Sequence, residues 1–422
     1  MTKQPRRFTN PVLDTLFQVK GNQRAALLTE PFFGIPSSLF TPFAAIYMAA
    51  LGLSPFQVGI ITTLSLLSQM VASLFGGVVA DKMGRRKSLF LFDMFCWAIP
   101  SLIWAFAQSF WWFVPAALLN GMWRISNVSY SLMLVEDARR EHLVHLYSLT
   151  NIATLLAGFV SPLAYLFVRR FSIVPTMRVL YGVMFFSMVA KNVILHANSY
   201  DTTVAKRRME ETKHISVLKR LWDSHDLLGR MVQNRRIILT MALMACYLII
   251  KNVNDNFWPL FVTDKLLIPD ETLSLFSTLR SMVMLFFTMT VGTRLRLDRF
   301  KRPLVLALGL YVLVNLMYVL LPVSAIGPLA LGTVMEALAL SILIPLTSTL
   351  LTSALEEEER ARMLSFAFML CLLVSSPFGL LSGWLSKMDR MLPLVLSGAV
   401  ALVAVWITLH LNKENEKEQA SA

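Results

Sequence analysis

Long uncharged apolar runs dominate this chain and predict helices that cross a lipid bilayer. Five of them contain no Asp, Glu, Lys or Arg: 56–80, 146–168, 303–322, 364–386 and 391–409. A spanning helix needs about 20 apolar residues, and it satisfies its backbone groups internally where lipid offers no hydrogen bonds. Seven apolar segments with few polar interruptions complete twelve predicted spans: 26–51, 88–108, 110–134, 176–197, 237–262, 271–293 and 326–353.

The composition agrees with this pattern and excludes other classes of protein. Hydrophobic residues make up 56% of the 422 residues, and charged residues make up 15%. An ordinary soluble domain carries about 25% charged residues. We therefore predict an all-α integral membrane protein surrounded by lipid, and exclude a soluble enzyme, a disordered chain and a fibrous protein.

The net charge of +13 reflects where the basic residues lie between the spans. Only six of the 39 Lys and Arg residues fall in the loops assigned outside, and most of the others fall in the tails and the alternate loops. Cytoplasmic loops of membrane proteins carry such an excess. We therefore place both termini in the cytoplasm and the protein in the plasma membrane, and we expect no nucleic-acid partner.

A polar stretch at 198–235 divides the chain into two halves of six predicted spans. The predicted organisation is an N-terminal tail, a six-helix bundle, a cytoplasmic linker, a second six-helix bundle and a C-terminal tail, with bounds 1–25, 26–197, 198–235, 236–411 and 412–422. Within the linker, apolar residues at helical spacing indicate a helix on the membrane surface: Ile215, Leu218, Leu221 and Trp222. A solvated tether is the alternative interpretation of this segment.

The halves also share short motifs. The sequence GVVADKMGRRK begins at Gly77 after the second span, and RLRLDRFKR begins at Arg294 after the eighth. Acidic and basic residues follow the fourth and tenth spans, from Glu136 and Glu356. Such repeats are typical of transporters whose two bundles rock about a central site.

On these residues the whole chain resembles the major facilitator superfamily, whose loop pattern is G-x-x-x-D-[RK]-x-G-[RK]-[RK]. The second copy departs from the pattern, because Arg294 and Lys301 stand where glycines are expected. The resemblance implies a twelve-helix fold, alternating access and a cytoplasmic latch between helix ends. The predicted latch residues are Gly77, Asp81, Lys82, Gly84, Arg85, Arg86, Glu136, Asp137, Asp298, Arg299 and Arg302.

Eight charged residues fall inside the predicted spans and away from the span ends, where each costs at least ~2.5 kcal/mol at the bilayer centre unless it faces a cavity or a partner. They are Glu30, Asp93, Arg124, Lys191, Lys251, Asp255, Arg280 and Glu336. Structural ion pairs between helices are one explanation, and a transport site is the other. Our predicted substrate and proton site comprises Glu30, Arg124, Lys251, Asn252, Asp255, Trp258, Arg280 and Glu336.

The seventh span carries the densest polar cluster of the predicted site. Lys251, Asp255 and Trp258 lie at spacings that place them on one helix face. Pro259 removes one backbone hydrogen bond, which predicts local unwinding there. For proton coupling, Glu30, Asp255 and Glu336 are the candidate carriers, and Lys251, Arg280 and Arg124 are the candidate switching partners.

No other chemistry is evident. The chain has no GxxxxGK[ST] phosphate loop, and its six histidines lack metal-ligand spacing. We therefore expect no cofactor, no bound metal and no enzymatic activity, and we expect a monomer. The predicted function is proton-coupled secondary transport of a small molecule, with drug or metabolite efflux favoured. A proton-linked importer of a sugar or small organic anion, a lipid or glycolipid flippase, and a sensor without turnover are the alternatives.

Overall fold

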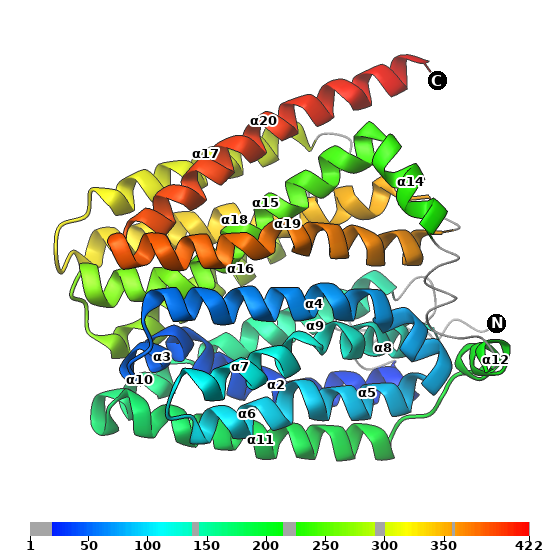
Figure 1. Cartoon of the computed structure of the whole chain (residues 1–422), viewed down its shortest axis with the longest axis horizontal. Helices are drawn as coiled ribbons and strands as arrows, with labels where there is room; N and C mark the ends of the chain where they lie inside the picture. The colour runs from blue at the N-terminus through cyan, green and yellow to red at the C-terminus, as the bar shows by residue number, and fades with distance from the viewer. Residues whose placement is uncertain (1–18, 137–142, 214–224, 292–299, 357–358, 422) are drawn as a thin grey trace.

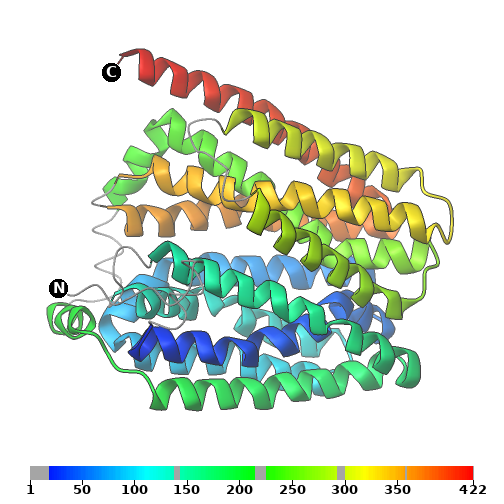
Figure 2. The same cartoon turned by 180° about the vertical axis from the view of Figure 1, so that it is seen from behind.

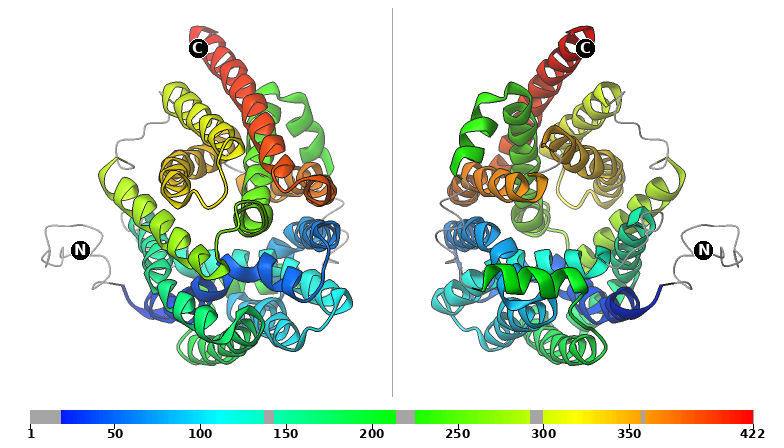
Figure 3. Two further views of the ribbon diagram at one scale, coloured as in Figure 1. Left: turned by 90° about the vertical axis from the view of Figure 1, so that its left-hand side faces the viewer. Right: turned by 90° about the vertical axis from the view of Figure 1, so that its right-hand side faces the viewer.

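The computed structural model describes residues 19–136, 143–213, 225–291, 300–356 and 359–421. All regular structure in these residues is helical, as the apolar runs predict. The helices form two groups, and the N-terminal group lies below the C-terminal group in Figure 1. End-on views show the same division (Figure 3).

The N-terminal half runs from Gly21 to Ala197. A reciprocal cap starts one of its longest helices, because the Ser54 hydroxyl accepts from the Gln57 backbone N–H and the Gln57 amide oxygen accepts from the Ser54 N–H. Its elements are α2 (Gly21–Phe40), η1 (Thr41–Phe43), α3 (Ala44–Ala50), α4 (Pro55–Met83), α5 (Arg85–Asp93), the π-helical turn η2 (Met94–Ala98), α6 (Ile99–Phe106), α7 (Phe110–Gly121), α8 (Trp123–Val135), α9 (Leu143–Ala157), η4 (Gly158–Val160), α10 (Pro162–Phe171) and α11 (Ile173–Ala197).

The linker and the C-terminal half follow. In the linker, α12 (Thr203–Thr212) and α14 (His225–Gln233) are described, and the predicted surface helix around Ile215–Trp222 lies outside the described residues. The C-terminal half comprises α15 (Arg235–Leu260), the π-helical turn η5 (Phe261–Lys265), η6 (Asp270–Thr272), α16 (Leu273–Thr290), α17 (Lys301–Val319), α18 (Ile326–Ala354), α19 (Arg360–Met388) and α20 (Leu392–Ser421).

Among the described residues, eleven helices are long and apolar enough to cross a membrane. The predicted span 110–134 consists instead of two shorter helices, α7 and α8, which meet at Met122. Next to this junction α7 packs closely against α4, since a Cβ on Gly121 would lie 2.4 Å from the Cβ of Ser68. The count of twelve spans and the cytoplasmic orientation of the termini therefore stay predictions.

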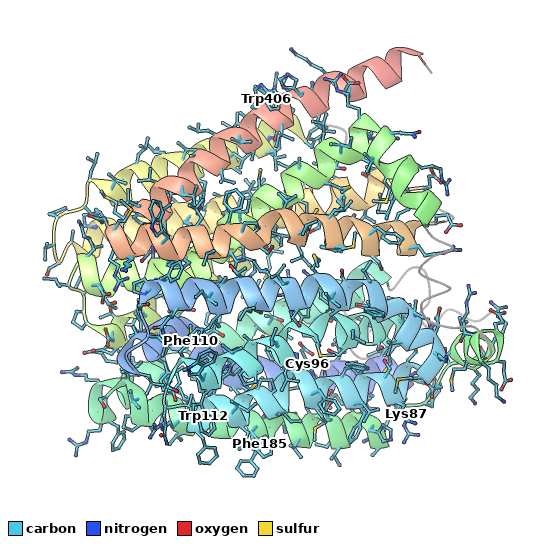
Figure 4. All side chains as sticks on the ribbon, viewed as in Figure 1. Lys87, Cys96, Phe110, Trp112, Phe185 and Trp406 are labelled. Carbon is cyan, nitrogen blue, oxygen red and sulfur yellow. The ribbon has the colours of Figure 1, made fainter. Side chains whose placement is uncertain are left out.

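The outer surface suits contact with lipid. Large apolar side chains project from it, including Trp112 and Trp406 (Figure 4), which are 42% and 58% exposed. The start of α2 and the end of α20 lie at the same end of the molecule, together with α12 and α14 (Figure 1). We call this end the near end and the opposite end, with α3 and α10, the far end.

Contacts between the halves place a potential site at their boundary. α4 packs against α19, and α16 packs against α9 and η4, as the view from behind also shows (Figure 2). Toward the far end, α4 and α19 meet backbone to backbone, because a Cβ on Gly59 would lie 2.6 Å from the Gly379 carbonyl oxygen and one on Gly383 would lie 2.7 Å from the Pro55 carbonyl oxygen. These glycines close the far end between the halves.

Candidate substrate and proton site

Glu336 on α18 is fully buried and is the centre of a polar cluster in the C-terminal half. Arg280 on α16 places its Nη2 3.0 Å from Glu336 Oε2, and the Tyr318 hydroxyl on α17 donates to the same oxygen at 3.4 Å. The Asn254 amide on α15 donates to Oε1. Burying a carboxylate is costly unless it is paired and hydrogen-bonded, and here donors from three neighbouring helices meet that need.

Small and aromatic neighbours shape this cluster. Gly332 lies one turn before Glu336, and a Cβ there would fall 2.4 Å from the Tyr318 ring, so the glycine makes room for the ring. The Trp258 ring lies 5.3 Å from the Arg280 guanidinium and packs edge-on against Phe276. The cation is thereby held between a carboxylate and an aromatic face.

Lys251 and Asp255 form an ion pair along α15. Their side chains are 53% and 44% exposed, whereas Trp258 on the same side of the helix is covered by α16. Asn252 accepts a hydrogen bond from Asn256 within the helix. The predicted unwinding at Pro259 is wrong: α15 continues through the proline, and the π-helical turn η5 follows it, so a local change in helix type accommodates the lost bond.

Arg124 on α8 lies at the boundary between the halves. Its guanidinium carbon lies 4.5 Å from the Trp123 ring and 4.7 Å from the ring of Phe368, which belongs to α19 in the other half. Tyr247 and Lys251 on α15 lie within electrostatic range. Arg124 Nε is buried without a hydrogen-bond partner, and no carboxylate among the described residues pairs with this side chain.

Glu30 lies in a second buried cluster, within the N-terminal half. The Tyr130 hydroxyl donates to its Oε2 at 3.1 Å, and Lys191 Nζ lies 3.7 Å from the same oxygen. Lys191 also lies over the rings of Phe33 and Tyr130. Asp93 is buried close to Lys191 and Glu30. The partner of Glu30 is thus Lys191 of its own half, not one of the three predicted switching cations.

The structure pairs six of the eight charges in the spans and separates the remaining two. The pairs are Glu30–Lys191, Lys251–Asp255 and Arg280–Glu336. Asp93 remains as an additional anion beside the N-terminal cluster, and Arg124 as an additional cation between the halves. Sequence reasoning left Asp93, Tyr130, Lys191, Asn254 and Tyr318 out of the site, although polar residues within apolar spans gave a signal for each.

Three of the predicted latch residues meet at the near end of the N-terminal half, around Arg85. Arg85 is 3% exposed and lies 2.9 Å from both Asp81 and Glu136. Glu136 also accepts a hydrogen bond from Thr202, the residue that caps the N-terminus of α12. The latch therefore ties α4, α5 and α8 to the linker helix.

The neighbouring latch residues have different roles. Arg86 binds the backbone oxygen of His196 through Nε at 2.8 Å, and its N–H donates to Asp201. Gly84 has φ +82°, a conformation that favours glycine. A Cβ on Gly77 would meet nothing within 4 Å, whereas one on Gly76 would lie 2.9 Å from Val128, so Gly76 is the glycine at the tight helix contact.

The remaining latch residues are only partly described. Lys82 is exposed on the last turn of α4, and Arg302 is exposed at the start of α17. Asp137, Asp298 and Arg299 lie outside the described residues. The second copy of the motif therefore stays a prediction.

The fold and the polar clusters together define a multi-pass membrane protein of the transporter class. The sequence profile of the Major Facilitator Superfamily matches residues 32–369, and the chain belongs to that family. The predicted family and all-helical fold are thereby confirmed.

Known relatives match only part of the chain. The uncharacterized MFS-type transporter YqjV of Bacillus subtilis (strain 168) is 31% identical over 117 residues, which is 27% of this chain and 28% of that protein. The quinolone resistance protein NorA of Staphylococcus aureus is 30% identical over 91 residues, 22% of this chain and 23% of NorA. The matched segments thus span about a quarter of each relative.

Solved transporters share the fold over nearly the whole chain. The nucleoside transporter NupG superposes with a TM-score of 0.69 at 12% identity, covering 93% of this chain and 99% of that one. The inward-open xylose transporter XylE from E. coli gives 0.66 at 14% identity, covering 91% and 94%. YqjV, NupG and XylE are transporters and not enzymes, in agreement with the prediction that this chain has no enzymatic activity.

Proposed function

We propose that this protein is a proton-coupled secondary transporter of the plasma membrane that exports small organic molecules by alternating access. The observation that carries the proposal is the burial of Glu336 against Arg280. A carboxylate held by a cation inside a span can take up a proton when that cation moves away, and intramembrane carboxylates often serve as proton relays.

The arrangement of the halves supports alternating access. Glycine packing between α4 and α19 closes the far end, and Arg124 and Lys251 approach each other from opposite halves. Rocking of one bundle against the other would alter the contacts at this boundary. The partial similarity to NorA, a quinolone resistance protein, supports export as the direction.

Proton flux in proteoliposomes tests the proposal. Vesicles with an interior pH dye are challenged with lipophilic cations, sugars and organic anions, and tracer movement of each compound is followed in parallel. We expect substrate-evoked proton flux in the wild-type protein, and its loss in Glu336→Gln, because an amide cannot carry the proton.

The matched control is Glu210→Gln, the same change on an exposed residue of α12, which should leave the flux unchanged. Tracer exchange without proton movement in the wild-type protein would overturn the coupling. The direction of transport is measured in vesicles in which the orientation of the protein is known. Whether an imposed pH gradient depletes or accumulates the tracer distinguishes export from import.

A further inference from the structure

Arg124 differs from the other three cations among the eight charges named above, because it lacks a counter-charge. Those three each lie within 4 Å of a carboxylate, and no such group among the described residues pairs with Arg124. An arginine at this depth, twelve residues or ~18 Å from the end of the span at Glu136, is costly without compensation. A bound anion would supply that compensation.

The surroundings of Arg124 favour a particular kind of anion. The rings of Trp123 and Phe368 lie against the guanidinium, so its N–H groups remain available mainly along its edges. The planar fork of an arginine matches a carboxylate, which accepts two parallel hydrogen bonds. The same rings offer an apolar surface for the rest of the ligand.

The position of Arg124 suits a transported ligand. Trp123 and Arg124 come from the N-terminal half, and Phe368, Tyr247 and Lys251 come from the C-terminal half. Lys251, from the C-terminal half, has a half-exposed side chain and lies within electrostatic range of Arg124. A ligand held here would contact both bundles, as alternating access requires.

We propose that Arg124 binds the carboxylate of an organic anion with an aromatic or apolar body, held at the edge of the guanidinium beside Trp123 and Phe368 and next to Lys251. This inference rests on the proposed transport function and names its substrate class. The competing role for Arg124 is conformational, in which it would exchange ion pairs with Asp255 as the halves move and would contact no substrate.

Calorimetric titration of the full chain in detergent tests the substrate class without any proton gradient. The probes are 2-naphthoate and hexanoate, and the neutral comparison compounds are 2-naphthamide and hexanamide. We expect the wild-type protein to bind at least one carboxylate in preference to its amide. In Arg124→Gln that affinity should fall about tenfold or more, the usual loss for a hydrogen bond to a charged group.

Two variants isolate the role of the guanidinium. Arg124→Lys keeps the charge without the fork and should lose less affinity than Arg124→Gln. The matched control is Arg169→Gln, which alters another arginine that lies over an aromatic ring, Tyr165, near the end of α10; its carboxylate affinity should equal that of the wild type.

Several results would overturn the inference: equal binding of amide and carboxylate, no carboxylate binding at all, or wild-type affinity in Arg124→Gln. The comparison of carboxylate with amide on the wild-type protein tests the proposed substrate class even if Arg124→Gln fails to fold. The two proposals can fail separately. If Glu336→Gln still binds carboxylates while the wild-type protein shows no proton flux, the substrate class is correct and the proposed proton coupling is wrong.

Discussion

Each half of this transporter buries one glutamate beside a cation and a tyrosine hydroxyl, but the two clusters differ in how completely the carboxylate is satisfied. In the C-terminal half, Glu336 is 0% exposed and receives hydrogen bonds from Arg280, Asn254 and Tyr318. In the N-terminal half, the Lys191 ammonium lies 3.7 Å from Glu30, beyond ordinary hydrogen-bond distance.

The clusters also differ in net charge. Glu336 and Arg280 balance each other, whereas Glu30 and Asp93 share the single positive charge of Lys191. The comparison teaches that similar residues in the two halves do not imply similar roles: the C-terminal cluster is a closed ion pair, and the N-terminal cluster has an unbalanced anion.

The largest effect should come from removing the cation of each cluster. Arg280→Met leaves Glu336 buried without its charged partner and should lower the free energy of unfolding by about 3–5 kcal/mol. Lys191→Met should cost about 2 kcal/mol, because the pair it breaks is longer and weaker. Denaturant titration in detergent, followed by circular dichroism, measures both losses.

A double variant checks the cause of that loss. Arg280→Met combined with Glu336→Leu removes both charges and should recover most of the stability, because a buried pair replaced by apolar groups is often neutral or stabilising. Equal losses for Arg280→Met and Lys191→Met would contradict the difference between the clusters, and so would a double variant no more stable than Arg280→Met alone.

The two copies of the loop motif extend the comparison to the near end of the molecule. Arg85 is buried between Asp81 and Glu136, so Arg85→Gln should cost about 2 kcal/mol by leaving two carboxylates without their cation. Arg302 is exposed, and Arg302→Gln should change stability by less than about 0.5 kcal/mol. The same titration measures both variants, and a comparable loss in Arg302→Gln would show that the second copy also forms a buried latch.

Much of the fold was predictable because its signals are local. Runs of about 20 apolar residues fix the spans, and the predicted latch residues included Arg85 and both of its partners, Asp81 and Glu136. The break at Met122 was missed, since an apolar run does not report where a helix is interrupted.

The site was predictable in its members but not in its pairings. Eight charges in apolar spans stand out in the sequence, yet which helices face one another depends on tertiary packing. Lys191 therefore remained unrecognised as the partner of Glu30, and Asn254 and Tyr318 as donors to Glu336. That Arg124 has no carboxylate partner among the described residues likewise depends on which carboxylates the other three cations bind.

The smallest expected effect comes from replacing a buried carboxylate with a neutral amide. The sign of the resulting change in unfolding free energy should differ between the two clusters. Asp93→Asn removes the additional anion beside Glu30, so Lys191 is left with one partner, and the unfolding free energy should rise by about 1 kcal/mol. Glu336→Gln removes the carboxylate that balances Arg280 and should lower the unfolding free energy. Thermal unfolding in detergent at pH 7 shows whether the midpoints move in opposite directions. A midpoint that fell in both variants would mean that Asp93 is itself stabilised by Lys191 as strongly as Glu336 is by Arg280, and the two clusters would then be equivalent.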